Sequence, residues 1–343
     1  MEVTECMTQE EIDATESFVE TESRKIVDLK PKQEGFSPLG FENWEEEIKK
    51  DYKSQLSSEE EEKISFNATK KFSDSEYQGD LLDRNRHGLG TMKYNNGRCY
   101  FGEWRNDLRE GRGIEIYTNG NRYIGWFKEG KAHGEGRYEW HNGEVYEGQW
   151  ENGIKCGRGK WTSPAGDSYL GEWEDSRAHG WGRHTWANGD WYEGEWVKCV
   201  KHGLGIEFYR DTGDKYFGHY RDGKHNGFGI YTYSNGTVYS GMFFEGKKHG
   251  KGKVKMPQGH IYIGHFENDV KHGKGYFRWA SGNQYRGEFF NDKRHGKGVM
   301  EWIDGSVYKG DWEKGIQHGI GSMTFSDGRP PKNGRFDQNK FVG

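Results

Sequence analysis

Histidine is the residue type whose spacing first suggests chemistry in this 343-residue chain. Eight of its fourteen histidines occupy one slot of a repeated motif: His87, His133, His179, His202, His249, His272, His295 and His318. Equivalent residues of successive hairpins should lie two strands apart, about 9.6 Å. Zinc holds nitrogen ligands at about 2.0–2.1 Å, so neighbours in this slot cannot share one ion. We interpret these histidines as turn-adjacent residues and predict no metal and no other cofactor.

Signatures of catalysis are absent from the sequence. It contains no HExxH, GxxxxGK[ST] or GxSxG motif. Its GxG pairs fall inside predicted hairpins and not between a strand and a helix, which excludes phosphate loops. Acidic residues recur after one repeated glycine, which indicates a solvated face and not an acid/base pair: Glu103, Glu172, Glu195, Glu288 and Asp311. We therefore predict that the protein is not an enzyme.

A basic cluster is the remaining candidate for binding chemistry. Its members follow the predicted hairpin turns of three neighbouring copies: Lys247, Lys248, Lys251, Lys271, Lys274, Lys293, Arg294 and Lys297. We expect them to crowd one long edge, where they would hold anionic lipid headgroups or acidic protein tails. The alternative is a charged edge that keeps sheets from aggregating. Nucleic acid fits less well as a partner, because the formal net charge is -5.

The elements that must position these residues are eleven tandem copies of about 23 residues. The copies open on Tyr-x-Gly at Tyr77, Tyr100, Tyr123, Tyr146, Tyr169, Tyr192, Tyr216, Tyr239, Tyr262, Tyr285 and Tyr308. Glycine fills the third, twelfth and fourteenth positions of every copy. Within a copy the pattern alternates with a period of two, as in Tyr146, Gly148 and Trp150. Polar turn residues divide each copy, and Asn-Gly, Asp-Gly or Ser-Gly follows near its end, which predicts one β-hairpin per copy.

The predicted fold is all-β: an elongated, single-layer antiparallel meander over residues 77–331. Glycine columns that face aromatic columns let rings lie across bare backbone. Aromatic residues make up 15% of the chain although its mean hydropathy is -1.14, and disordered chains are poor in aromatics. The candidate partner-binding aromatic face comprises Tyr123, Tyr138, Trp140, Tyr146, Trp150, Trp173, Trp186 and Trp196.

Residues 1–76 are a separate acidic segment, with 21 acidic and 10 basic side chains. Thr8-x-x-Glu11 matches a helix capping box. Phe41, Trp44, Ile48 and Tyr52 share one face of a predicted helix over about 38–56, with Ser37-Pro38 at its start. This helix either caps the open sheet edge beside Tyr77 or docks a partner, and the spacing favours neither.

At the other end of the chain, Pro330-Pro331 should stop the growth of the sheet, because proline has no N–H for a ladder. Residues 332–343 then resemble a partial twelfth copy. The four cysteines lack metal or disulfide spacing, which favours a reduced cytosolic compartment. Neither a signal peptide nor a membrane-spanning stretch is predicted.

The copies, which read YxGxW…GxxHGxGxYxWxNG, resemble the MORN repeat (membrane occupation and recognition nexus) over residues 77–328. Departures from its pattern are local: Glu110, Cys156 and Asn226 replace the usual histidine, and Leu81 replaces the first aromatic. The resemblance implies a non-catalytic scaffold or protein-interaction platform. Similar chains with many copies and no catalytic domain include the radial spoke head subunits of motile cilia.

That similarity implies a cytoplasmic, cytoskeletal location in the axoneme of a cilium or flagellum, with other radial spoke subunits as partners. MORN arrays also occur in junctional membrane proteins and beside lipid kinases, which implies an alternative: an adaptor that binds phosphoinositides or a membrane surface. The open sheet edges and exposed aromatics would allow a homo- or hetero-oligomer, and the sequence does not choose between them.

Overall fold

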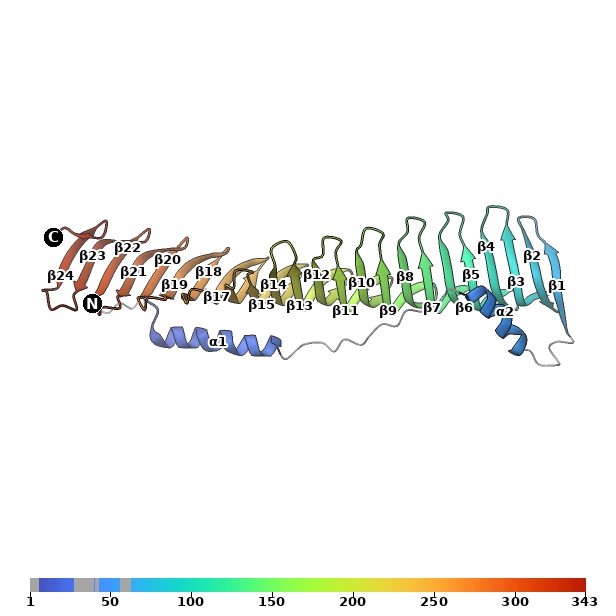
Figure 1. Ribbon diagram of the computed structural model, residues 1–343, viewed down its shortest axis with the longest axis horizontal. Helices are drawn as coiled ribbons and strands as arrows, with labels where there is room; N and C mark the ends of the chain where they lie inside the picture. The colour runs from blue at the N-terminus through green and yellow to red at the C-terminus, as the bar shows by residue number, and fades with distance from the viewer. Residues whose placement is uncertain (1–5, 28–39, 41–42, 56–62) are drawn as a thin grey trace. The chain divides into compact units, whose positions relative to one another are not determined.

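The computed structural model describes residues 6–27, 40, 43–55 and 63–343. Within these residues lie two helices and 25 consecutive strands, which form a single antiparallel sheet (Figure 1). The prediction of an all-β, single-layer antiparallel meander is therefore confirmed. The chain divides into two compact units, one of residues 33–200 and one of residues 1–32 with 201–343, and each has its own helix.

The unit of residues 33–200 contains the blue-to-green half of the sheet in Figure 1. Its elements are α2 (Trp44–Gln55), β1 (Ile64–Lys71), β2 (Ser75–Leu82), β3 (Asn85–Tyr94), β4 (Cys99–Arg105), β5 (Leu108–Ile116), β6 (Arg122–Lys128), β7 (Lys131–Glu139), β8 (Val145–Glu151), β9 (Ile154–Thr162), β10 (Ser168–Glu174), β11 (Arg177–Thr185) and β12 (Trp191–Val197).

Strand β1 precedes the first copy and pairs with β2 from Ile64↔Leu82 to Lys71↔Glu76. Sequence reasoning missed this strand because it lacks the Tyr-x-Gly start. Its position corrects the interpretation of the predicted helix as an edge cap, since β1 and not α2 occupies the edge beside Tyr77. The predicted helix start at Ser37-Pro38 and its Phe41 lie outside the described residues.

The other unit combines the first helix with the second half of the sheet. Its elements are α1 (Gln9–Val27), β13 (Val200–Tyr209), β14 (Asp214–Arg221), β15 (Lys224–Thr232), β16 (Val238–Phe244), β17 (Lys247–Lys255), β18 (Ile261–Glu267), β19 (Val270–Arg278), β20 (Gln284–Phe290), β21 (Lys293–Glu301), β22 (Val307–Glu313), β23 (Ile316–Thr324), β24 (Lys332–Asp337) and β25 (Lys340–Phe341).

The sheet continues beyond Pro330-Pro331, where the sequence predicted its end. Strand β24 pairs with β23 from Gly319↔Phe336 to Met323↔Lys332. The two prolines fall in the connection between these strands, outside the ladder, so no backbone N–H is required of them. The prediction that they stop the sheet is wrong for this reason.

The predicted capping box at the start of α1 is present. The backbone N–H of Glu11 donates to Thr8 Oγ1 at 3.1 Å, and the backbone N–H of Thr8 donates to Glu11 Oε2 at 2.8 Å. This reciprocal pair satisfies two backbone donors that the first turn of a helix leaves without intrahelical partners. It explains why α1 begins at Gln9 although its apolar pattern is weak.

Each copy is built on a tyrosine ring that lies across two glycines. In the eighth copy Gly241 and Gly252 pair across β16 and β17. A Cβ added to either glycine would lie 2.6 Å from an atom of Tyr239. The Tyr239 hydroxyl donates to the carbonyl oxygen of Met242 at 2.7 Å. The same bond, from the opening tyrosine to the residue three positions on, recurs in all eleven copies.

The opening tyrosines and the aromatics four residues after them form a buried ladder in each unit. Tyr100 meets Trp104 and Phe127 edge-on, with ring centroids 5.1 Å apart in both pairs. Tyr239 meets Phe243 and Phe266 in the same way, again at 5.1 Å. Such pairs contribute about 0.5–1.5 kcal/mol beyond the area they bury. Because each ring touches the next copy, neighbouring hairpins stabilise one another, as a marginal single hairpin requires.

A β-bulge in the second strand, which recurs in ten copies, explains the twelfth glycine. Between β6 and β7 the register shifts after Gly125, and Gly134 adopts a φ of 61°, a left-handed conformation that glycine reaches at little cost. An acidic side chain after the third-position glycine then accepts a nearby backbone N–H. Glu103 accepts from Arg112 at 3.1 Å, and Asp311 accepts from Ile320 at 2.8 Å. These carboxylates, predicted as a solvated face, thus hold the bulge.

We expect Gly252→Ala to lower the free energy of unfolding by about 2 kcal/mol, because the new Cβ would overlap the Tyr239 ring and force repacking. The measurement is the urea midpoint of the full chain, followed by tryptophan fluorescence. Gly246→Asn is the matched control. Gly246 lies in a turn at a φ of 84° with open space around its Cβ position, and Asn tolerates that conformation. Equal midpoints for the two variants would contradict the role assigned to the ring.

Candidate functional site

Strand alternation gives each unit two different faces. The aromatic face carries the ladder of opening tyrosines. The opposite face, here called the helix face, packs against α1 or α2. Ile114 and Ile124 form a buried cluster with Trp44 of α2. Ile124 follows Tyr123 directly in β6, so the two side chains point to opposite sides of the sheet.

Helix α2 contains the three described residues of the predicted docking helix, Trp44, Ile48 and Tyr52. Ile48 is fully buried, and Trp44 meets Trp126 edge-on at 6.4 Å. Asp51 of the same helix forms an ion pair with Arg112 at 3.0 Å. The apolar side of α2 therefore packs on the helix face of its own unit, and a partner would have to displace it. Over the described residues the helix runs from Trp44 to Gln55.

Half-buried aromatics form an outer row on the aromatic face, beside the ladder. They come from the ends of the second strands and the loops that follow: Tyr94, Tyr117, Tyr138, Trp140, Trp161 and Trp186 in one unit, and Tyr209, Tyr231, Tyr233, Phe277, Trp279, Trp302 and Phe325 in the other. Where one copy contributes two rings to the outer row, as in the two pairs that follow, those rings are in contact. The centroids of Tyr138 and Trp140 are 4.7 Å apart, and those of Tyr231 and Tyr233 are 4.5 Å apart.

All eight residues of the predicted aromatic face lie on this face, but the structure divides them. Tyr123, Tyr146, Trp150 and Trp196 are buried in the ladder, between 0% and 8% exposed. Trp173 is a half-buried ladder member. Tyr138, Trp140 and Trp186 belong to the outer row. Only half-buried rings offer area to a partner, and the period-two pattern alone cannot separate them from rings that neighbouring copies cover.

Cations form a column between the ladder and the turns, one residue after each hairpin turn in seven copies. They stand over ladder rings: Arg86, Arg109, Lys155, Lys201, Lys248, Lys271 and Arg294. Arg294 lies 4.2 Å from the centroid of Trp312, and Lys155 lies 4.8 Å from that of Trp173. Burial lowers the pKa of Lys155. Each such contact contributes about 0.5–2 kcal/mol to the stability of the fold. These charges therefore have a structural role, which sequence reasoning missed.

The predicted basic cluster does not form one continuous edge. Lys248, Lys271 and Arg294 belong to the cation column on the aromatic face. Lys251, Lys274 and Lys297 lie on the helix face, where Lys274 pairs with Glu11 of α1 at 3.3 Å and Lys297 pairs with Asp311. Lys247 and Lys293 are exposed at turns. The bulge and the strand alternation together distribute the cluster over both faces.

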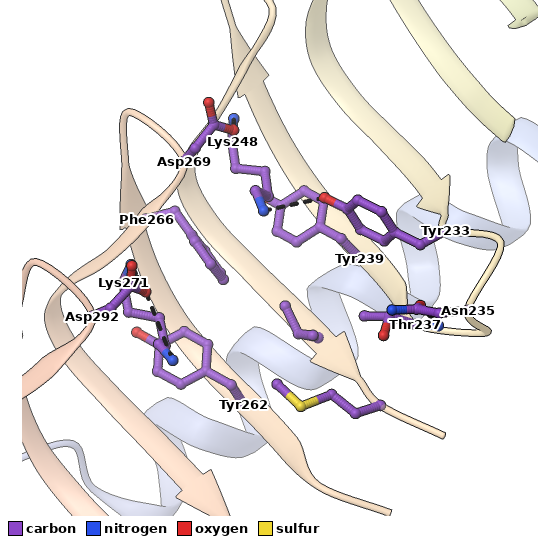
Figure 2. A pocket seen from close by; sticks show the side chains of 12 residues that line it. Tyr233, Asn235, Thr237, Tyr239, Lys248, Tyr262, Phe266, Asp269, Lys271 and Asp292 are labelled. Carbon is purple, nitrogen blue, oxygen red and sulfur yellow. Dashed lines mark hydrogen bonds and ion pairs between the residues drawn. The ribbon is translucent and has the colours of Figure 1, made fainter. Parts of the chain in front are cut away.

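A pocket of ≈ 260 Å³ opens in the aromatic face where the eighth copy lacks outer-row rings. Val254 and Met256 take the places that aromatics fill in the copies on either side. Figure 2 shows Tyr233 and Tyr262 beside this space, with Lys248 and Lys271 reaching toward it. Lys248 Nζ donates to the Tyr233 hydroxyl at 3.2 Å, and Lys271 Nζ lies 3.7 Å from Asp292. The pocket can hold an apolar side chain next to a carboxylate.

A buried acidic cluster interrupts the aromatic face in the sixth copy. Glu207, only 7% exposed, stands at the position that Tyr138, Trp161, Tyr231 and Phe277 occupy in other copies. It accepts hydrogen bonds from the hydroxyls of Tyr209 and Tyr220, both at 2.9 Å, and pairs with Lys201. Burial by itself raises the pKa of Glu207, but the hydrogen bond from His225 and the charge of Lys201 outweigh it and lower this pKa to about 2. The carboxylate therefore stays ionised at neutral pH.

The repeated histidines lie beside the hairpin turns and contact different groups. His179 Nδ1 lies 3.1 Å from Glu174, and His318 Nδ1 lies 3.2 Å from Asp337. In the second copy Glu110 takes the histidine position and accepts the backbone N–H of Glu129 at 2.9 Å. Among the residues that the structure describes, no three His, Cys, Asp or Glu side chains gather as a metal-binding group.

Eleven segments of the chain match the MORN repeat: residues 77–97, 100–122, 123–145, 146–168, 169–191, 192–213, 216–238, 239–261, 262–284, 285–307 and 308–328. The chain belongs to the MORN-repeat family. An opening tyrosine begins each of the eleven matched segments, so each MORN copy coincides with one ring-on-glycine unit described above. Neither helix, over the described residues, is long and apolar enough to cross a membrane.

Other similarities are partial. A 62-residue stretch is 37% identical to the "Inactive protein tyrosine kinase pTKL" of Plasmodium falciparum, and it covers 18% of this chain and 4% of that protein. The TCP domain of SAS-4 (dCPAP) of Drosophila melanogaster, solved with a proline-rich motif of Ana2, matches with 16% identity and a TM-score of 0.30. That match covers 46% of this chain and 85% of the domain.

The wild-type TCP10 domain of Danio rerio CPAP matches with 12% identity and a TM-score of 0.33, and the match covers 59% of this chain and 94% of the domain. These TM-scores are too low to support an argument about function.

We expect Glu207→Gln to reduce the pH dependence of stability of this MORN array. The folded pKa of Glu207 is depressed from its ordinary 4.5 to about 2, so its ionised form stabilises the fold above pH 4.5. That contribution is lost as the pH falls from about 5 to 2. The gap in unfolding free energy between wild type and variant should be about 3 kcal/mol at pH 7 and should narrow with acid.

The measurement is urea unfolding at a series of pH values between 2.5 and 7. Glu245→Gln is the control, because Glu245 is an exposed carboxylate that also pairs with a lysine, Lys224. The unfolding free energies of the wild type and of Glu245→Gln should differ by less than about 1 kcal/mol. A Glu207→Gln gap that does not change with pH would refute the assigned titration.

Proposed function

We propose that this MORN protein is a non-catalytic scaffold that binds partner proteins along its aromatic face, as a component of the radial spoke head in the axoneme of motile cilia or flagella. The observation that carries the binding part is the outer row, whose half-buried rings recur in successive copies of each unit. Equivalent positions recur about every 9.6 Å along a meander of hairpins. Aromatic side chains held rigidly at a surface are the residues that dominate protein–protein binding energy.

The arrangement of the two faces supports this use of the aromatic face. Both described helices pack on the helix face, α2 through Ile48 and Trp44, and α1 through Ile12 and Val19. The outer row lies on the other side of the sheet, with the cation column beside it. A partner that presents apolar side chains flanked by acidic residues matches this pairing of rings and positive charges.

The axonemal part of the proposal rests on the many tandem MORN copies, in which the chain resembles MORN-repeat radial spoke head proteins. Its predicted partners are other radial spoke subunits, in a homo- or hetero-oligomer. A cytoskeletal location in the cilium follows from the same similarity.

The alternative function is an adaptor for phosphoinositides or another membrane surface. The exposed Lys247 and Lys293 favour it, because their positive charges stand at hairpin turns two copies apart. Against it, Lys253 and Lys274 are paired with acidic residues of α1, and Lys271 is paired with Asp292. The structure thus leaves fewer charges for lipid headgroups than the sequence predicted, and we favour the protein scaffold.

We expect the double variant Trp140→Ala/Trp186→Ala to lose radial spoke subunits from affinity purifications of ciliated cells. Removing two outer-row rings deletes contact area while leaving the buried ladder in place. The readout is quantitative mass spectrometry of the co-purified proteins, with a fall of about tenfold or more expected. Phe244→Ala is the control, because Phe244 is 57% exposed at a turn and outside the row. Equal recovery with both variants, or purification without axonemal proteins, would overturn the proposal.

For the alternative, we expect no more flotation of the full chain with vesicles that contain phosphatidylinositol bisphosphate than with neutral vesicles. Charge reversal by Lys247→Glu and Lys293→Glu should then leave flotation unchanged. Flotation that requires the phosphoinositide and is abolished by the reversals would replace the scaffold proposal with the lipid adaptor, since surface lysines each contribute about 1 kcal/mol to such binding.

A further inference from the structure

Helix α1 is seated on the helix face of its own unit, across β15, β16, β17 and β18 (Figure 1). More than 200 residues separate it in sequence from most of the strands that it covers. It carries no MORN pattern, and its apolar content is low. Its contacts therefore need an explanation of their own, apart from the repeat that builds the sheet.

Few apolar side chains anchor α1. Ile12, 2% exposed, packs with Met7 against Ile263, and Val19, 3% exposed, packs against Leu204 and Phe228. Phe18 adds an edge-on contact with Phe228 at 5.9 Å. Thr15 lies between the two anchors on the same side of α1. Its hydroxyl donates a hydrogen bond to the carbonyl oxygen of Glu11, within the same helix. The anchor is a narrow stripe and not a broad apolar face.

Charge complementarity supplies the rest of the contact. The sequence of α1 holds six acidic residues and two basic ones. Glu11 pairs with Lys274 of β19 at 3.3 Å, and Glu16 pairs with Lys253 of β17. These lysines lie on the helix face, and Lys253 lies two residues along β17 from Lys251, on the same face. A basic sheet surface thus receives an acidic helix.

The seat is incompletely filled. A hollow of ≈ 380 Å³ remains between the second half of α1 and strands β16 and β17. Ser23 of α1 faces this space, opposite Val238, Ser240 and Lys255 of the sheet. A helix with a larger apolar side chain at the place of Ser23 would bury area that α1 leaves open, and so would bind more tightly.

We propose that the helix face over β15–β18 is a docking site for an acidic amphipathic helix of a partner protein, and that α1 occupies it as an exchangeable internal occupant. The partner helix carries aliphatic residues at the spacing of Ile12 and Val19, acidic residues at that of Glu11 and Glu16, and a large apolar residue where α1 has Ser23. The site lies on the face opposite the outer row, so it is independent of the proposed function. Tethering gives α1 a high effective concentration at the seat, which suppresses weaker competitors.

The test measures the binding of a labelled peptide of residues 6–27 to the full chain by fluorescence anisotropy. The double variant Ile12→Asp/Val19→Asp releases α1 and leaves the sheet intact. We expect this variant to bind the peptide at least tenfold more tightly than the wild-type chain, because the tethered competitor is gone. A peptide with Ser23→Leu should bind about tenfold more tightly again, since it fills the hollow. Lys253→Glu/Lys274→Glu in the released chain should weaken binding by a similar factor.

Equal affinity of the wild-type and released chains for the peptide, or no binding by the released chain, would overturn the proposal. So would binding of phosphatidylinositol bisphosphate vesicles, but not of peptide, by the released chain. The peptide with Ile12→Asp/Val19→Asp is the matched control and should not bind.

A second measurement does not depend on the folding of any variant. In hydrogen–deuterium exchange of the wild-type chain, the amides of α1 should exchange at least tenfold faster than those of β17, because the helix detaches while the sheet stays paired. Exchange of α1 and β17 at the same rate would show that the helix is a fixed part of the unit.

Discussion

The contact of one tyrosine ring with two glycines determines most of this structure. A Cβ on either glycine would overlap the ring, as at Gly241 and Gly252 beneath Tyr239. Because neither glycine has a side chain, the ring lies flat on the backbone and is fully buried. Its hydroxyl donates a hydrogen bond to a carbonyl oxygen of its own strand. A single layer of sheet can then bury large apolar groups without a second layer, because the ring covers backbone and the next copy covers the ring.

The other repeated features follow from this contact. The bulge at the twelfth glycine lies near the start of the second strand, and the second residue of that strand faces the ladder. In seven copies that residue is a cation in contact with the rings, such as Arg294 over Trp312. Acidic side chains near the third glycine hold the bulge through backbone N–H groups, as Glu103 does. Charge on the aromatic face is therefore part of the packing, and Glu207 is stable there because Lys201, His225 and two tyrosines surround it.

The two faces of the sheet divide the surface between internal and external contacts. Neighbouring copies bury the rings of the ladder, whereas the rings of the outer row remain partly exposed to solvent. On the helix face, the residues next to the repeated glycines vary from copy to copy. The chain places aliphatic groups there in some copies, as at Ile114 and Ile263, and lysines in others, as at Lys253 and Lys274. This variation, superimposed on a repeated ladder, is what gives each helix a distinct seat.

The sequence alone determined the meander, because a period-two pattern copied eleven times is compatible only with strands, and it determined the ring-against-glycine packing. It also located the capping box of α1, since that motif acts over four residues. Only the tertiary structure decided which rings are buried, where β1 and β24 pair, and how the basic cluster is distributed over two faces. Those outcomes depend on bulges and on contacts such as Glu11 with Lys274. Residues that distant in sequence leave no local pattern of their pairing, because the energy that joins them exists only after the sheet has formed.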